Sequence, residues 1–194
     1  MIKVVDNLIS KKYQDKIINT VNDNYFPWYF YETILSDEKI KKASNKNITL
    51  TPAFVHTLFI LPKGINSNYY NFFIKILDTF NVKEIIRIRI RRTFKQETHS
   101  LKKYNYPHVD IDKQQNYKSL VYYVEDSDGD TVFFDKKYKL GGPTFINSNY
   151  KEIKRVSPKK GRAIYFDGEI YHAGNNPVNS DIRTIINFDF TTNE

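Results

Sequence analysis

The stretch Glu84-Ile-Ile-Arg-Ile-Arg-Ile-Arg-Arg-Thr-Phe94 alternates between apolar and basic side chains over most of its length. Successive side chains of an extended chain point to opposite faces, so the isoleucines share one face and the arginines the other. The two faces are Ile86, Ile88 and Ile90 on one side, and Arg87, Arg89 and Arg91 on the other. This period of two predicts a half-buried β-strand.

Further short strands are expected downstream, separated by turn sequences such as Asp126–Gly129 and Ser157–Gly161. They are Tyr117–Val124, Thr131–Asp135, Ile153–Val156, Arg162–Asp167 and Ile182–Phe190. Upstream, apolar residues at helical spacing predict helices over Leu8–Val21, with Ser10 as a plausible N-cap, and over Asn68–Phe80. The pattern predicts one domain over 1–194 that is mainly β with flanking helices (α+β): a helical and strand flank over 1–83 and an antiparallel sandwich or jelly roll over 84–190.

The composition of the 194 residues narrows the chemistry. The chain has no Cys, which excludes disulfides, thiolate metal sites and thiol nucleophiles. A metal would therefore be held by Asp, Glu, backbone or the four His. The formal net charge is +8, which permits an anionic partner but also fits simple compositional drift. Because no signal peptide or membrane span is visible, we expect a cytoplasmic protein.

Two of the four His stand beside other polar residues in informative positions. In Pro107-His108-Val-Asp110, the His and Asp side chains leave the same face of an extended backbone and can chelate one ion. His172, shortly after the strand expected over Arg162–Asp167, is the candidate third ligand. Two His and one carboxylate leave octahedral positions open, as in non-haem Fe(II) oxygenases.

Arg183 stands at the head of the last apolar strand. A guanidinium in such a position is costly unless it meets an anion, and the carboxylate of a small molecule would be a matched partner.

These features resemble the 2-oxoglutarate and Fe(II)-dependent oxygenases, specifically their prolyl 4-hydroxylase-like branch. The resemblance runs from about Glu84 to Phe190 and joins the following ordered pieces: His108–Asp110, Ser119–Val124, Asp128–Phe134, Pro158–Phe166, His172 and Arg183. The Ser127–Thr131 stretch is also similar to members found in marine phage genomes. Two departures are Asp130, where the family often has a second Gly, and the arginines of Ile86–Arg91, where many relatives have a Tyr.

The resemblance implies a double-stranded β-helix (jelly-roll, cupin-like) core and a dioxygenase that hydroxylates its substrate while 2-oxoglutarate becomes succinate and CO2. It implies Fe(II) on His108, Asp110 and His172, O2 as oxidant, and ascorbate as a candidate reductant. It also implies that the far carboxylate of 2-oxoglutarate pairs with Arg183 and is hydrogen-bonded by Tyr123, although a packed core aromatic remains the alternative for Tyr123. A peptide or small-molecule substrate is expected, with a prolyl or other amino-acid residue favoured, in the host cytoplasm if the chain is phage-encoded.

Three other functions stay open. They are a non-catalytic jelly-roll binding module, a basic domain that binds nucleic acid or another anionic partner, and a Zn(II) hydrolase built on the same three ligands. The arginines of Ile86–Arg91 belong to this question, because they either line a groove for an anion or form the polar face of an edge strand.

The remaining candidates have mainly structural interpretations. His56 is expected to be a satisfied core or surface His, His99 to be exposed, and Trp28 to belong to the core rather than a substrate cleft. The long polar loops Lys95–Tyr106 and Lys136–Tyr150 are the places where substrate specificity is expected.

Overall fold

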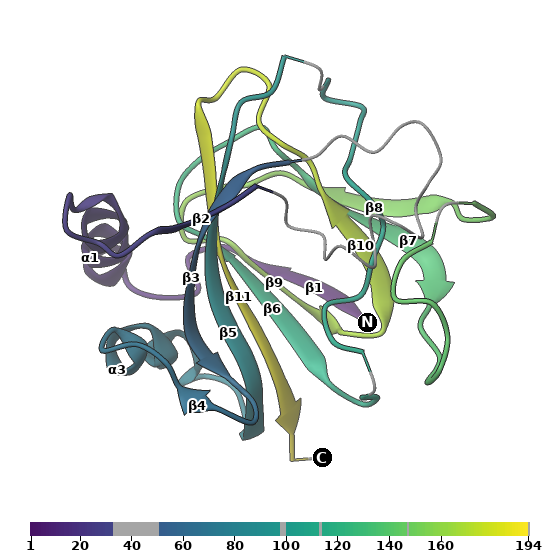
Figure 1. Ribbon diagram of the computed structural model, residues 1–194, viewed down its shortest axis with the longest axis horizontal. Helices are drawn as coiled ribbons and strands as arrows, with labels where there is room; N and C mark the ends of the chain where they lie inside the picture. Colours follow the sequence, from purple (N-terminus) through teal and green to yellow (C-terminus); the bar gives the residue numbers. More distant parts are fainter. Residues whose placement is uncertain (33–50, 98–99, 113, 147, 194) are drawn as a thin grey trace.

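The computed structural model describes residues 1–32, 51–97, 100–112, 114–146 and 148–193. Its strands form a large and a small antiparallel sheet that face each other, and the helices lie against the outer side of the large sheet (Figure 1). This arrangement confirms the predicted jelly-roll core with flanking helices. Among the described residues, no helix has the length and apolar character needed to cross a membrane.

The large sheet joins segments from both ends of the chain. Its order is β1 (Ile2–Val5), β9 (Ala163–Asp167), β6 (Lys118–Tyr123), β11 (Ile182–Thr192), β5 (Val82–Phe94), β3 (Ala53–Ile60) and β2 (Tyr29–Tyr31), with β4 (Gly64–Ile65) paired to β3. The small sheet has the order β10 (Ile170–Gly174), β7 (Thr131–Lys137) and β8 (Glu152–Val156). Most neighbours are distant in sequence, so the crossovers wrap the chain around a shared interior.

The outer face of the large sheet carries the main apolar core. Ile88 and Ile90 of β5 and Phe188 of β11 are fully buried there. Helix α1 (Lys11–Asn22) covers them with residues such as Ile17, which is also fully buried. Complete burial of such a side chain stabilises the fold by about 1.5–3 kcal/mol, so this face fixes the sheet beneath the site.

The second predicted helix is shorter than expected. Instead of one helix over Asn68–Phe80, the structure has a single turn, α3 (Tyr70–Phe73), followed by the 3-10 helix Ile74–Leu77. Three of the residues that the apolar spacing placed on the buried face, Phe73, Ile76 and Leu77, are indeed buried. Aromatic and β-branched residues have modest helix propensity, which helps explain why tertiary packing tightens this segment.

The expected strands are all present, with ends that differ by a few residues. In the described part of the chain, the structure also has five strands that were not predicted: β1, β2, β3, β4 and β10. His172 therefore lies within β10 rather than in a segment after a strand. The edge-strand interpretation of Ile86–Arg91 is wrong, because β5 lies between β3 and β11.

Candidate metal centre

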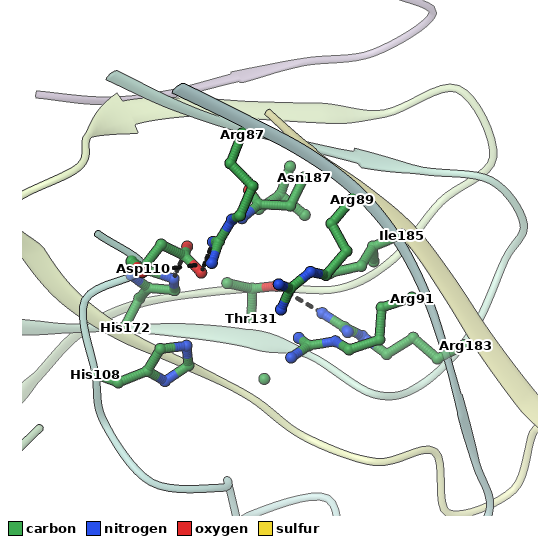
Figure 2. Close-up of a pocket in the computed structure, with 12 residues that line it drawn as sticks. Arg87, Arg89, Arg91, His108, Asp110, Thr131, His172, Arg183, Ile185 and Asn187 are labelled. Atoms are coloured by element: carbon green, nitrogen blue, oxygen red, sulfur yellow. Dashed lines mark hydrogen bonds and ion pairs between the residues drawn. The ribbon is translucent and has the colours of Figure 1, made fainter. Parts of the chain in front are cut away.

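Three predicted side chains meet in the interior between the sheets. His108, Asp110 and His172 each place one ligand atom so that these atoms lie within 4.8 Å of one another. Figure 2 shows them grouped at one end of a pocket. The sequence separation of the second His from the first pair is closed by the crossover that brings β10 beside residue 108.

A short antiparallel pairing positions the two histidines. The backbone N–H of His108 donates to the carbonyl of His172 at 2.8 Å, and the N–H of His172 donates back at 3.0 Å. His108 also bridges Phe145, and Val109 donates to Thr144, so the loop before β8 supports the same segment. Reciprocal pairing fixes the spacing of the two rings, whose centroids are 4.9 Å apart.

Backbone carbonyls fix the orientation of both imidazoles. Nδ1 of His108 lies 2.8 Å from the carbonyl of Tyr106, and Nδ1 of His172 lies 3.1 Å from that of Ile170. Since a carbonyl only accepts hydrogen bonds, each Nδ1 carries the proton and each Nε2 is left as the metal-binding atom. Burial lowers the pKa of His108 to about 3, which keeps this ring neutral.

Arg87 holds Asp110 in its ionised form. Burial alone would raise the pKa of this carboxyl, but the positive charge of Arg87, 2.6 Å away, holds it well below its usual range. The same guanidinium contacts Asp189 at 2.8 Å, and Asp189 also accepts a hydrogen bond from Ser119 at 2.7 Å. The Arg87 side chain therefore ties a carboxylate that could bind metal to one that is fully buried in the sheet.

Sequence reasoning missed this supporting network. Arg87, Asp189 and Ser119 are directly opposite one another across β5, β11 and β6. The available signal was the carboxylate of Asp189 in the mainly apolar strand Ile185–Phe190, because a buried charge requires a partner.

The three candidate ligands fit a divalent metal. Nε2 of His172 and Oδ2 of Asp110 are 3.1 Å apart. Two neighbouring ligands with metal bonds of about 2.1 Å at a right angle would lie about 3 Å apart. The donor set of two neutral imidazoles and one carboxylate is that of the facial triad of non-haem iron oxygenases.

Arg183 lies at the other end of the pocket and is buried. Its Nε donates to the carbonyl of Gly129, and one terminal nitrogen donates to Thr131 Oγ1 at 2.9 Å. These contacts aim the guanidinium along the pocket wall (Figure 2). No carboxylate in the described part of the chain forms an ion pair with it, which leaves its charge available to a ligand.

Tyr123 lies behind the pocket wall rather than in it. Its side chain is fully buried, and its hydroxyl donates to Thr131 Oγ1 at 2.6 Å. The guanidinium of Arg183 lies 5.6 Å from its ring centroid. The structure thus places Tyr123 against two residues that line the pocket, in a position to orient Arg183 and Thr131; direct contact with a cosubstrate stays a prediction.

The basic face of β5 points into this pocket, whose volume is about 470 Å³ when the open mouth is included. Arg87, Arg89 and Arg91 all line it, together with the candidate metal ligands and Arg183. These arginines therefore line a groove and do not form the polar face of an edge strand. The register explains their convergence, since Arg89 is opposite Asn187 and Arg91 is opposite Ile185 on the inner face of β11.

Gly129 is required by the close approach of two neighbours. A Cβ at this position would lie 2.6 Å from the Asn175 carbonyl oxygen and 2.7 Å from Cδ of Arg183. We expect Gly129→Ala to lower the free energy of unfolding by about 1–3 kcal/mol, because the backbone must shift to admit the methyl group. Thermal unfolding measures this loss, and Gly141→Ala is unsuitable as a control because its φ of +81° strains any other residue. A better control is Lys63→Ala, at an exposed turn position. An unchanged melting temperature in Gly129→Ala would contradict the crowding.

The other candidates have structural roles or lie outside the described residues. His56 is buried, with its ring nitrogens 2.7 Å from the Pro27 carbonyl and from Ser67 Oγ. Trp28 packs on the edge of the apolar core and donates to the Val21 carbonyl. His99 lies outside the described residues. Asp130, which stands where the resembled family often has a Gly, forms an ion pair with Arg155 at 3.6 Å.

Comparisons with solved structures connect this geometry to known proteins. A prolyl hydroxylase from Trichoplax adhaerens, in complex with a hypoxia inducible factor peptide fragment, has a TM-score of 0.61 at 10% identity and covers 97% of this chain and 83% of its own. A prolyl-4-hydroxylase from Pseudomonas putida has a TM-score of 0.54 at 11% identity and covers 99% and 92%. The chain has the fold of the 2-oxoglutarate-dependent oxygenases.

An epimerase also shares this fold. The epimerase SnoN, in complex with Fe3+, alpha ketoglutarate and nogalamycin RO, has a TM-score of 0.62 at 8% identity and covers 98% of this chain and 78% of its own. No protein-family model matches the sequence, and the search of curated proteins found no match. The likeness is therefore one of fold.

Proposed function

We propose that the chain is a single-domain Fe(II)- and 2-oxoglutarate-dependent dioxygenase that hydroxylates an amino-acid residue or a small molecule. The observation that carries this proposal is the placement of His108, Asp110 and His172 at one end of a pocket and Arg183 at the other. The oxygenase fold supports the same assignment.

One set of residues would bind the metal, and another would bind the cosubstrate. His108, Asp110 and His172 would hold Fe(II), with Arg87 keeping the carboxylate ionised. Bound Fe(II) would supply oxidation of the substrate by O2, coupled to decarboxylation of 2-oxoglutarate. Arg183 would bind the far carboxylate of the cosubstrate, while Thr131 and Tyr123 orient its guanidinium. The apolar walls contributed by Val121 and Ile185 would limit water around the cosubstrate.

Succinate formation tests this proposal without knowledge of the substrate. Purified protein with Fe(II), 2-oxoglutarate, ascorbate and air is expected to release succinate slowly, since cosubstrate decarboxylation can proceed uncoupled from hydroxylation. His172→Ala should remove that turnover, because it deletes a ligand atom. Wild-type protein assayed without iron is the matched blank. A protein that binds neither iron nor 2-oxoglutarate would instead be a non-catalytic jelly-roll module.

A Zn(II) hydrolase is the less supported alternative. The same three ligands would suit such an enzyme, but hydrolysis does not require the buried Arg183 opposite them. The predicted cytoplasmic location, phage origin and role for ascorbate remain predictions.

A further inference from the structure

The pocket contains more positive charge than the proposed cosubstrate needs. Figure 2 shows the guanidinium groups of Arg89, Arg91 and Arg183 gathered away from the two histidines. Arg89 and Arg91 come from alternate positions of β5, and Arg183 comes from the start of the neighbouring strand β11. All three line the same pocket as the candidate metal ligands.

Within the part of the chain that the structure describes, Arg87 is the one arginine of this pocket that forms ion pairs. Arg87 forms ion pairs with both Asp110 and Asp189. Within the described ranges, neither Arg89 nor Arg91 has a side-chain hydrogen bond or an ion pair, and the Nε atom of each is buried without an acceptor. Buried polar atoms are normally satisfied, so these two side chains indicate a partner group that the described part of the chain does not provide.

Burial and neighbouring positive charges destabilise the protonated forms of Arg89 and Arg91. Burial, followed by the charge of Arg183, lowers the pKa of Arg91 to about 10, and burial with the charge of Arg87 lowers that of Arg89. Both remain protonated at neutral pH. An anion placed among them would relieve this repulsion and gain charge-assisted hydrogen bonds.

The cosubstrate of the proposed function accounts for only part of this charge. One carboxylate of 2-oxoglutarate would lie on the metal and the other on Arg183. Arg89 and Arg91 would still lack a counterion. Their planar groups offer paired N–H donors that match carboxylate or phosphate oxygens.

We propose that the substrate to be oxidised is itself an acid, and that Arg89 and Arg91 bind its carboxylate or phosphate group beside the cosubstrate. This inference rests on the proposed function for its assignment of Arg183 to 2-oxoglutarate. It narrows the substrate to molecules with an acidic group near the oxidised position, such as a free amino acid or a small phosphate ester. A neutral prolyl residue alone would leave both arginines unpaired.

Anion binding in the presence of saturating 2-oxoglutarate tests the proposal. The protein, loaded with Mn(II) under nitrogen, is titrated with inorganic phosphate or acetate at constant ionic strength, with acetamide as the uncharged counterpart of acetate. Phosphate, acetate or both are expected to raise the melting temperature, and acetamide is not. Arg89→Gln and Arg91→Gln should weaken this effect at least about tenfold, because each removes a charged donor.

Three controls separate the proposal from its alternatives. Arg92→Gln changes the neighbouring arginine, whose Nε instead bonds Thr184 outside the pocket, and should leave anion binding unchanged. Arg89→Lys keeps the charge and should retain part of the anion effect if Arg89→Gln fails to fold. The affinity for 2-oxoglutarate should change less than about twofold in Arg89→Gln and Arg91→Gln, compared with a large loss in Arg183→Ala.

Specific results would overturn the inference. Anion effects that vanish when 2-oxoglutarate is saturating would place the anion in the cosubstrate position. Equal effects in the wild type, Arg89→Gln and Arg91→Gln would indicate an adventitious ion only. A protein that binds phosphate through Arg89 and Arg91 but fails to bind 2-oxoglutarate would refute the proposed function while leaving an anion pocket.

Discussion

Asp110→Ala is expected to abolish iron-dependent succinate formation and to weaken metal binding by more than about 100-fold. Loss of a residue that merely supports a metal ligand typically costs 10–100-fold in affinity, and Asp110 is the proposed ligand itself. It is also the only carboxylate among the three candidate ligands in the described residues. Calorimetric titration with Mn(II) under nitrogen measures the affinity, and a succinate assay measures turnover.

The fold should survive this substitution. Arg87 keeps its contact with Asp189, which is itself hydrogen-bonded by Ser119, so the buried guanidinium is not left without a counterion. Circular dichroism should therefore match that of the wild type. Asp112→Ala, two residues away at an exposed position, is the matched control and should bind metal normally. Full turnover in Asp110→Ala would end the assignment of this triad.

Arg183→Ala should raise the 2-oxoglutarate concentration needed for half-maximal succinate formation by about 30-fold or more. Removing one member of a buried, hydrogen-bonded charge pair costs about 2–5 kcal/mol, since the remaining charge loses its partner. The affinity for Mn(II) should change little, because Arg183 contacts Gly129 and Thr131 rather than a candidate metal ligand. Titrations with metal and cosubstrate separate the two effects.

Arg183→Lys is the informative companion variant. It keeps the positive charge but loses the forked donor geometry, so its 2-oxoglutarate affinity should fall between those of the wild type and Arg183→Ala. Its melting temperature also reports how much of the change comes from the lost hydrogen bond to Gly129. Equal losses of metal and cosubstrate affinity in both variants would make Arg183 a structural residue instead.

Local sequence patterns were sufficient where a single segment carries the physical signal. The alternation of Glu84–Phe94 predicted β5, and the His-x-Asp spacing predicted two side chains on one face of an extended segment. Turn sequences separated most of the later strands. These features depend on backbone period and local conformation, which neighbouring residues largely determine.

The pairing of distant strands could not be worked out in the same way. The contacts that support Asp110 depend on the register of β5, β11 and β6. This register sets Arg87 opposite Asp189, and Asp189 opposite Ser119. A shift of one residue would turn Asp189 toward the apolar helices. Sequence periodicity gives two faces for each strand but does not say which strand lies beside it.

The sequence by itself therefore determined the β-rich class, the candidate ligands and the presence of a basic strand face. Only the tertiary structure decided that this basic face lines the pocket, that Arg87 supports Asp110, and that Tyr123 lies behind Thr131. The physical reason is burial: a charged or polar side chain has one meaning in water and another between two sheets, where each charge needs a partner. Which environment a residue enters is set by contacts between segments far apart in the chain.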